Sequence, residues 1–234
     1  MEIIPGLEIV DLTLKYKDTL ILGDLQLGYE QSLNNRGFLL PSFNLNAIIE
    51  RLEKIFAKVK VKRVVVNGDV KHEFGKILRK EWKETTELFE WMLKRVKEII
   101  IVKGNHDVIL GPIAEKMNIQ LVEYYQIDDL TILHGHKIIA KMTKIIIVGH
   151  EHPAVSFPEK PYEKFKCFLK GEWNGHILIV MPSFNFVSEG TDITKSEFLG
   201  PFLKDRNIDS FEVFVVDDKV YRFGKVEDIT TLEK

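Results

Sequence analysis

Five apolar segments of this 234-residue chain end abruptly in polar side chains of metal-binding type. In chain order they are LILGDLQ, VVVNGD, IIIVKGNHD, LTILHGH and IIIVGHEH. Each apolar run has the length and composition of a buried strand. In open α/β sheets, ligand sites gather beyond the carboxyl ends of the strands, so these five ends are expected to share one site.

Helical and strand patterns alternate in the first half of the chain. Residues 44–60 and 80–98 carry apolar residues at helical spacing, and Asn44 is a candidate N-cap for the first of these helices. Residues 7–24 read as a pair of strands, and strands dominate from Ile119 onward, where residues 119–127 read as one strand. The order predicts an α/β sandwich of two sheets with helices outside. No repeat or Gly/Ser linker is visible, so residues 1–234 are expected to form one domain.

Charge, cysteine content and hydropathy limit the partners and the location. The formal net charge is −2, whereas proteins that grip duplex DNA through its phosphates usually carry a basic excess. The single cysteine, Cys167, excludes an internal disulfide and is expected to be a small buried side chain. No apolar stretch reaches the roughly 20 residues that span a bilayer, and no signal peptide is seen, so no membrane partner is expected. These features predict a cytoplasmic protein.

Six polar residues at the strand ends form a candidate ligand set. An Asp after a strand is usually a turn residue or a helix cap, and a lone His such as His176, at a strand start, is usually structural or solvated. Five of the seven histidines, however, lie in or beside these strand ends. The set is Asp24, Asp69, Asn105, His134, His150 and His152.

Mixed carboxylate, amide and imidazole ligands suit Mn, Fe, Zn, Co or Ni better than Ca or Mg. Two such ions about 3.5–4 Å apart need a bridging carboxylate, and together they clamp a phosphate oxygen. Paired ions of this kind generate hydroxide near neutral pH.

The order D-x-(H), GD, GNHD, H, GHxH resembles the calcineurin-like metallophosphoesterase superfamily, and it spans Asp24 to His152. Within it, GDLQLGYEQSLNNRGFLLP is similar to a segment of the ligase-associated DNA-repair (PdeM-type) phosphoesterases and of their archaeal SbcD-related cousins. The resemblance implies a four-layer αββα sandwich with two mixed sheets flanked by helices. It also implies a binuclear phosphoesterase that uses two divalent ions, most simply Mn.

The resemblance further implies a role for each motif residue. Asp69 would bridge the metals, with Asp24 and His152 at the first ion. The second ion would be held by Asn105, His134 and His150.

Three further residues take catalytic roles by resemblance. His106 would protonate the leaving oxygen or stabilise the phosphate, and Asp107 would orient its ring. His72 stands three residues after the bridging Asp69, where SbcD-type nucleases carry a histidine that assists at the phosphate. The alternative for His72 is a solvated loop histidine.

Gln26 departs from the family pattern, which has His at this position. An amide oxygen is a weaker donor than imidazole toward transition metals. Gln26 could coordinate through its carbonyl, hold a water, or only hydrogen-bond Asp24. In each case the first metal is expected to bind more weakly than the second.

Other polar residues near the motifs have open roles. His136 shares the strand face of His134 if that strand continues, and Glu151 is expected to point away from the metals. Arg36 could contact a substrate phosphate or be an exposed structural residue. Ser183 and Asn185 lie near the site by resemblance, and the alternative is a loop that closes the sandwich.

We therefore predict a phosphodiesterase or nuclease acting on nucleic acid or nucleotides, by attack of a metal-bound hydroxide on phosphorus. The near-neutral charge favours nucleotides, short single strands or dependence on a partner, and a helicase or ligase partner would fit the resemblance. Two alternatives are a phosphomonoesterase and a non-catalytic binding module whose first metal site is degraded at Gln26. The oligomeric state is not predicted.

Overall fold

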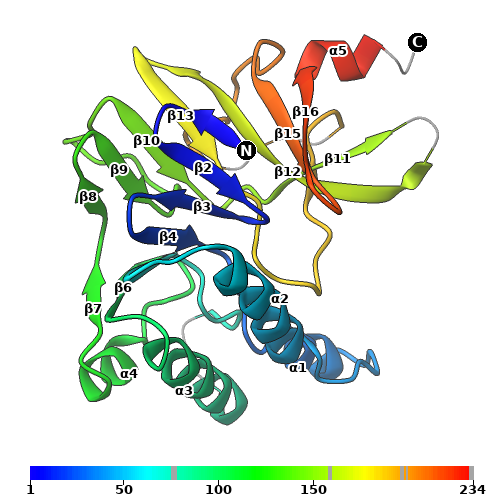
Figure 1. Ribbon diagram of the computed structural model, residues 1–234. Helices are drawn as coiled ribbons and strands as arrows, with labels where there is room; N and C mark the ends of the chain where they lie inside the picture. The colour runs from blue at the N-terminus through cyan, green and yellow to red at the C-terminus, as the bar shows by residue number, and fades with distance from the viewer. Residues whose placement is uncertain (75–77, 158–159, 196–197, 199, 232–234) are drawn as a thin grey trace.

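Two β-sheets lie face to face in the computed structural model, and most of the helices cover the outer side of one of them (Figure 1). The structure describes residues 1–74, 78–157, 160–195, 198 and 200–231. Within these residues the first sheet has seven strands, in the order β1 (Glu2–Ile4), β2 (Leu7–Val10), β3 (Thr13–Tyr16), β4 (Thr19–Leu22), β5 (Arg63–Asn67), β6 (Glu98–Val102) and β7 (Gln120–Val122).

The first sheet is mixed, because β1 to β4 pair antiparallel whereas β4 to β7 pair parallel. Parallel neighbours need crossover connections, which helices supply here. The crossovers contain α1 (Tyr29–Asn35) and α2 (Asn44–Lys58), then α3 (Arg79–Leu93), then α4 (Gly111–Lys116). The carboxyl ends of β4, β5 and β6 consequently meet at one edge of this sheet.

The second sheet is also mixed and, counted over the described residues, has nine strands. Those strands are β8 (Tyr125–Ile127), β9 (Leu130–Leu133), β10 (Ile145–Val148), β11 (Pro153–Phe157), β12 (Lys160–Trp173), β13 (His176–Val180), β14 (Thr191–Asp192), β15 (Glu212–Val216) and β16 (Val220–Lys225). Strands β9, β10 and β13 pair parallel, and the long β12 pairs with β11, β13 and β15.

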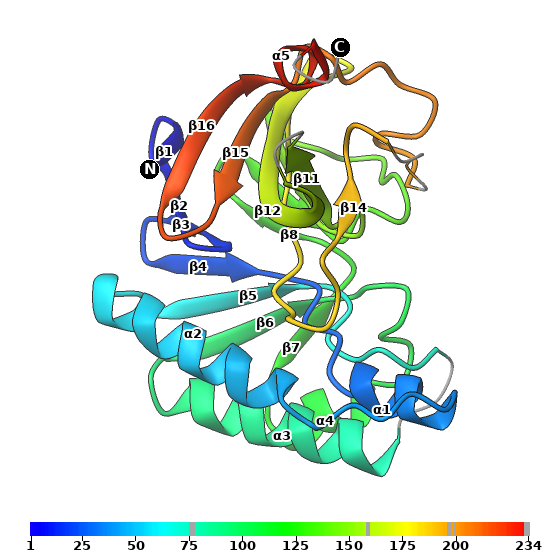
Figure 2. The same cartoon turned by 90° about the vertical axis from the view of Figure 1, so that its right-hand side faces the viewer.

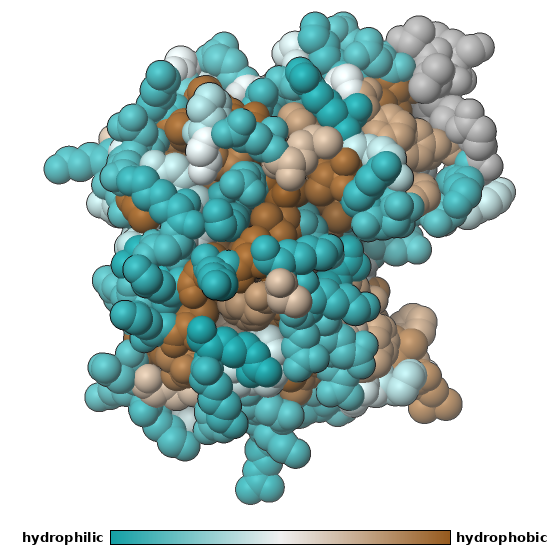
Figure 3. All heavy atoms as spheres, viewed as in Figure 1, coloured by the Kyte–Doolittle hydropathy of each residue, from teal (hydrophilic) through white to brown (hydrophobic). Residues whose placement is uncertain are grey.

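Helices α1 to α4 cover the outer face of the first sheet (Figure 2). Helix α2 buries Ile48, Leu52 and Ile55, which are spaced at one helical face, and these side chains belong to a core that reaches to the inner face of the second sheet. On the face seen in Figure 3, hydrophobic residues form an oblique band among hydrophilic ones.

The outer face of the second sheet is covered differently. A second core packs its strands against Phe202, Ile208 and Phe211 of the segment before β15 and against the short α5 (Val226–Thr231). The buried Cys167 lies in this core, as expected for an apolar thiol. The prediction of an α/β fold with two mixed sheets flanked by helices is confirmed, with the helices concentrated on one side.

The N-cap prediction for Asn44 is wrong. Asn44 is the first residue of α2, and its side-chain amide donates to the carbonyl of Leu25 at 3.1 Å. The cap is supplied instead by buried Glu30, whose Oε1 accepts from the N–H groups of Phe43 and Asn44 at 3.0 and 2.8 Å. A carboxylate at a helix N-terminus also suits the positive end of the helix dipole.

Two strand predictions also need correction. Residues 7–24 form three strands, because Asp11 adopts a φ of 59° and turns the chain between β2 and β3. Residues 119–127 form β7 and β8, which belong to different sheets, so the chain crosses the sandwich there. In the described part of the chain, every helix is too short or too polar to cross a bilayer.

Candidate metal centre

The predicted ligands come from both sheets and meet where the ends of their parallel strands face each other. Asp24 and Asp69 follow β4 and β5 of the first sheet, and Asn105 follows β6. His134 follows β9 of the second sheet, and His150 and His152 follow β10. The sheet-to-sheet packing therefore brings together residues that are up to 128 positions apart, from 24 to 152 in the chain.

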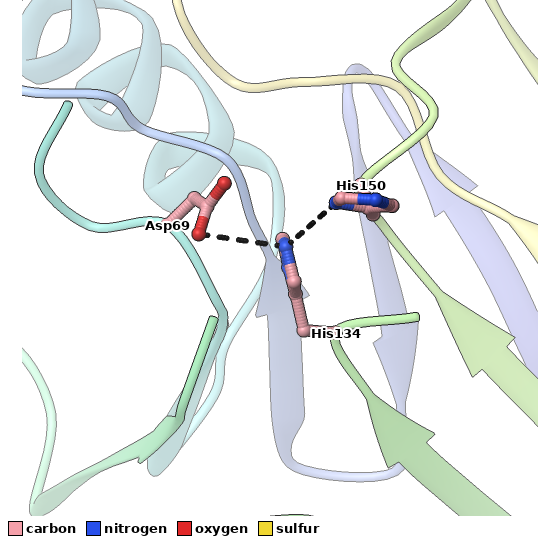
Figure 4. Close-up of side chains that lie close together, drawn as sticks. All are labelled: Asp69, His134 and His150. Carbon is pink, nitrogen blue, oxygen red and sulfur yellow. Dashed lines mark hydrogen bonds and ion pairs between the residues drawn. The ribbon is translucent and has the colours of Figure 1, made fainter. Parts of the chain in front are cut away.

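The tightest group surrounds the imidazole of His134 (Figure 4). Its Nε2 lies 3.4 Å from Oδ1 of Asp69, 3.1 Å from Nδ1 of His150 and 3.0 Å from Oδ1 of Asn105. One ligand atom each from Asp69, His134 and His150 lies within 4.8 Å of the others. These are the residues assigned by resemblance to the bridge and to the second metal.

A second group forms around the buried carboxylate of Asp24. Its Oδ1 lies 3.1 Å from Nε2 of His152 and 3.6 Å from Nδ1 of His134, and its Oδ2 accepts from the N–H of His150 at 3.1 Å. Gln26 is fixed beside it by its backbone, since its N–H donates to the carbonyl of Asp69 at 2.9 Å. The side-chain amide of Gln26 makes no hydrogen bond to another described residue, so the pairing with Asp24 that we considered is not formed.

The donor set fits divalent metal ions. Oδ1 of Asp24, Nδ1 of His134 and Nε2 of His152 are buried and have no hydrogen-bond partner among the described residues. Such unpaired buried donors and acceptors are costly unless a bound group satisfies them. Carboxylate, imidazole and amide ligands together suit Mn, Fe, Zn, Co or Ni.

Burial disfavours the charged form of each group in this cluster, and neighbouring charges determine which groups stay ionised. Burial raises the pKa of Asp69, but His134 and His106 outweigh it and hold that pKa below its ordinary value. Burial lowers the pKa of His134, yet Asp69 and Asp24 raise that pKa to about 9. Burial and then the charge on His134 lower the pKa of His150 to about 4. The metal-free cluster thus holds a proton on His134, which a metal ion would displace.

The backbone is strained at the same place. Asp24, Gln26, Asp69, His150 and His152 have φ values of 56°, 46°, 44°, 69° and 50°. Non-glycine residues rarely occupy this left-handed region, and such strain tends to collect at functional sites.

Gly68 has a packing reason to lack a side chain. Its φ is 78°, and a Cβ at this position would overlap the ring of His134. The GD motif therefore places Asp69 against His134 only because the preceding residue is glycine.

His106 reaches the cluster from the loop after β6. Its backbone N–H donates to Oδ1 of Asp69 at 3.1 Å, and its Nε2 lies 3.9 Å from Oδ2 of the same carboxylate. Its Nδ1 lies 2.5 Å from the carbonyl oxygen of His72.

Asp107 does not orient that ring, contrary to the prediction. Its two buried oxygens accept from the backbone N–H groups of Val70 and Gly104 at 3.0 and 2.9 Å. Burial, followed by repulsion from Asp69, raises the pKa of Asp107 to about 7. Asp107 therefore joins the two ligand loops, and the carbonyl of His72 holds the ring.

His72 lies beside His106 in a row of rings. It stacks on Tyr29 with a centroid distance of 3.9 Å and lies 5.8 Å from the ring of His106. Burial and then the nearby His106 lower the pKa of His72 to about 4, so its ring is neutral at pH 7. Phe74, 63% exposed, meets His106 edge-on at 5.5 Å.

The remaining candidates are placed as follows. β9 ends at Leu133, so the strand does not continue to His136, although that ring still lies 5.3 Å from the ring of His134. Glu151 turns away into a loop contact, where it accepts from the N–H of Gly200. Arg36 is exposed at the end of α1, and His176 bonds the carbonyl of Thr143 at 2.7 Å, as a structural residue would.

Asn185 supports the group around Asp24, and Lys166 holds both Ser183 and Asn185. Asn185 donates from Nδ2 to the backbone carbonyl of Asp24 at 3.1 Å. Lys166 of β12 donates to the hydroxyl of Ser183 at 2.8 Å and to the carbonyls of Ser183 and Asn185.

Lys166 and the fully buried Lys71, which follows the strand-end GDV, were missed from the sequence. Lys71 donates to the carbonyl of Glu73 and so fixes the loop that carries His72. Nothing in the sequence separates these two lysines from ordinary surface lysines.

Comparison with known proteins agrees with this geometry. A family model described as calcineurin-like phosphoesterase matches residues 18–209, which is most of the chain. The chain therefore belongs to the calcineurin-like phosphoesterase family. It is a metal-dependent hydrolase of phosphoester bonds.

A search of solved structures found matches that include two bacterial proteins. The nuclease MPE of Pseudomonas putida aligns with a TM-score of 0.65 at 16% identity, covering 91% of this chain and 92% of that protein. YfcE, a phosphoesterase from E. coli, aligns with a TM-score of 0.44 at 15% identity, covering 86% and 88%. A search of curated proteins found no match. At this identity the nuclease supports the sandwich fold alone.

Proposed function

We propose that this protein is a phosphodiesterase or nuclease that acts on nucleic acid or nucleotides with two divalent metal ions. The observation that carries the proposal is the convergence of ligands from both sheets on Asp69, with His106 facing the same carboxylate. The assignment of a bridging Asp69, a first site at Asp24 and His152, and a second at Asn105, His134 and His150 belongs to this proposal.

When bound, the ions supply a nucleophile from water at neutral pH and neutralise charge on the phosphate. His106 is held by the carbonyl of His72 so that its Nε2 faces the cluster and can give a proton to the leaving oxygen. The neutral ring of His72 offers a further hydrogen bond near the phosphate. Lys166 and Asn185 keep the backbone of Asp24 in place.

The surroundings of His106 favour a nucleic-acid substrate. Phe74 is largely exposed beside this ring and offers a face on which a base can stack. The similarity of GDLQLGYEQSLNNRGFLLP to PdeM-type and archaeal SbcD-related phosphoesterases, together with His72 beside His106, supports the same substrate class. We retain Mn as the expected metal, with the first site weaker because of Gln26.

The first test is Mn-dependent hydrolysis of bis-p-nitrophenyl phosphate. We expect the wild type to be active and the activity of Asp69→Ala and Asn105→Ala to fall by more than roughly 100-fold. Mutation of a residue that only contacts a metal ligand already lowers activity by about 10–100-fold. The exposed Asn46→Ala serves as a matched control and should keep full activity. Calorimetric titration with Mn should show weaker binding in the two site variants.

Two outcomes would replace the proposal. Faster hydrolysis of p-nitrophenyl phosphate than of the diester would indicate a phosphomonoesterase. Absence of hydrolysis with Mn, Fe, Zn, Co and Ni, while the metals still bind, would indicate a binding module with a degraded site.

Three broader expectations accompany the proposal. A helicase or ligase partner would fit the resemblance, and the cytoplasm is the expected location. Residues 1–234 are proposed to act as one domain, because each sheet alone supplies only half of the ligands.

A further inference from the structure

A cavity opens directly beside the candidate metal centre, at the ends of β6, β7 and β9. Its volume is about 380 Å³, within the range of about 300–1,000 Å³ that is usual for small-ligand sites. We name it the flanking pocket, and the residues that matter in its lining are Lys103, Asn105, Val108, Glu123, His136 and Lys137.

The flanking pocket begins at a proposed metal ligand. Asn105 lines it and also contacts Nε2 of His134 through Oδ1 at 3.0 Å. The ring of His136 lies 5.3 Å from that of His134 and 6.3 Å from that of His150. A group bound in the pocket would therefore be the immediate neighbour of a phosphate held at the metals.

Two lysines converge in the pocket on a single carboxylate. Nζ of Lys103 lies 3.2 Å from Oε1 of Glu123, and Nζ of Lys137 lies 2.5 Å from Oε2. Two positive charges thus share one negative charge. The side chains are 39–49% exposed, and ion pairs at such exposure contribute little to stability. A phosphate can compete with Glu123 for these ammonium groups at little cost.

The other walls complete a site for a nucleotide. The ring of His136 forms one of these walls. Val108 is 71% exposed and gives an apolar surface for a sugar or base.

We infer that the flanking pocket binds the phosphate next to the scissile one, so that the substrate is an oligonucleotide strand. The inference rests on the proposed phosphodiesterase function and deepens it. Lys103 and Lys137 bind the neighbouring phosphate, and Glu123 keeps their side chains converged until it arrives. A diester with a single phosphate leaves the pocket empty.

The kinetic test compares two thymidine substrates, the dinucleotide TpT with one phosphate and the trinucleotide TpTpT with two. In the wild type, KM should be lower for TpTpT. The double variant Lys103→Ala/Lys137→Ala should raise KM for TpTpT by roughly tenfold, the scale of a charge-assisted hydrogen bond, and leave TpT and bis-p-nitrophenyl phosphate unchanged.

A matched double variant removes the same charge elsewhere. Lys204→Ala/Lys219→Ala takes two exposed lysines that do not line the flanking pocket, and it should leave both KM values unchanged. Equal effects of the two double variants on TpTpT would overturn the inference, because general charge would then explain the result. So would a Lys103→Ala/Lys137→Ala variant with the wild-type ratio of KM values.

A binding measurement without metal separates this inference from the proposed function. The anisotropy of a fluorescein-labelled dT octamer is followed with the metal-free protein in EDTA at several salt concentrations. Because the two lysines neutralise one phosphate, the variant Lys103→Ala/Lys137→Ala should reduce the slope of log affinity against log salt by about 0.7, the value for one phosphate of a single strand. This change supports the pocket even if no diester is hydrolysed, and an unchanged slope overturns it.

Discussion

The carbonyl oxygen of His72 lies 2.5 Å from Nδ1 of His106. A carbonyl only accepts a hydrogen bond, so Nδ1 carries a hydrogen and Nε2 is the nitrogen that gains or loses the exchangeable proton. Nε2 lies 3.9 Å from Oδ2 of Asp69. The loop after β5 therefore sets the tautomer of a histidine that comes from the loop after β6.

This arrangement predicts a leaving-group effect for His106→Asn. We expect kcat on TpT to fall by about 10²–10⁴-fold, the usual contribution of a general acid. The fall on bis-p-nitrophenyl phosphate should be much smaller, because p-nitrophenolate departs without a proton. Steady-state kinetics on both substrates measures the difference.

The affinity for Mn provides the control, and it should be unchanged in His106→Asn. Equal losses on the two substrates would show that His106 does not protonate the leaving group.

Asp107→Ala should destabilise the loops after β5 and β6 and should leave the orientation of the His106 ring unchanged. It leaves the buried N–H groups of Val70 and Gly104 without an acceptor, so we expect the free energy of unfolding to fall by roughly 2–4 kcal/mol. Urea unfolding of the metal-free protein measures this, with exposed Asp129→Ala as the neutral control. If Asp107→Ala reproduced the leaving-group effect of His106→Asn, Asp107 would be orienting the ring after all.

Gln26→His should strengthen the weaker metal site. An imidazole is a better ligand than an amide for Mn or Zn, and we expect the weaker affinity to rise on the order of tenfold. Calorimetry with Mn should resolve a strong and a weak site in the wild type. Asn105→Ala is the opposite control, since it should weaken the strong site. Two equal sites in the wild type would contradict the role given to Gln26.

Lys166 predicts a pH dependence of stability. Burial, opposed only in part by the charge of Asp24, lowers its pKa to about 7 from the ordinary 10.5. Between pH 7 and 10.5 the unfolded chain binds more protons at this residue, so its contribution makes the free energy of unfolding rise with pH. The limit for one proton is about 1.4 kcal/mol per pH unit.

The comparison variant is Lys166→Met, which has no titrating group at this position. The free energy of unfolding is measured by urea unfolding in EDTA for both proteins. The value for the wild type minus the value for the variant should rise from pH 7 to 10 and stay constant from pH 5 to 6.5. A difference that stays constant up to pH 10 would mean that Lys166 is charged in the folded protein at neutral pH.

Local pattern was sufficient for much of the fold. Apolar runs such as Val64–Val66 form strands because β-branched side chains suit a buried sheet, and the helical spacing of Ile48, Leu52 and Ile55 predicts α2 correctly. Pattern failed where the chain changes direction without a strong signal. The step from β7 to β8 occurs at Glu123 and Tyr124, where no glycine or proline marks the change of sheet.

The sequence by itself determined the fold class and the residues available for the metal centre, because strand periodicity and strand-end motifs are local properties. Only the tertiary structure decided which groups touch. The packing of the two sheets places His134 against Asp69 and Asp24, and it opens the flanking pocket beside Asn105. It also places the ring of His106 in hydrogen-bonding distance of the backbone carbonyl of His72. A carbonyl has no sequence signature, and neither does the burial of a lysine such as Lys71, since both depend on neighbours far away in the chain.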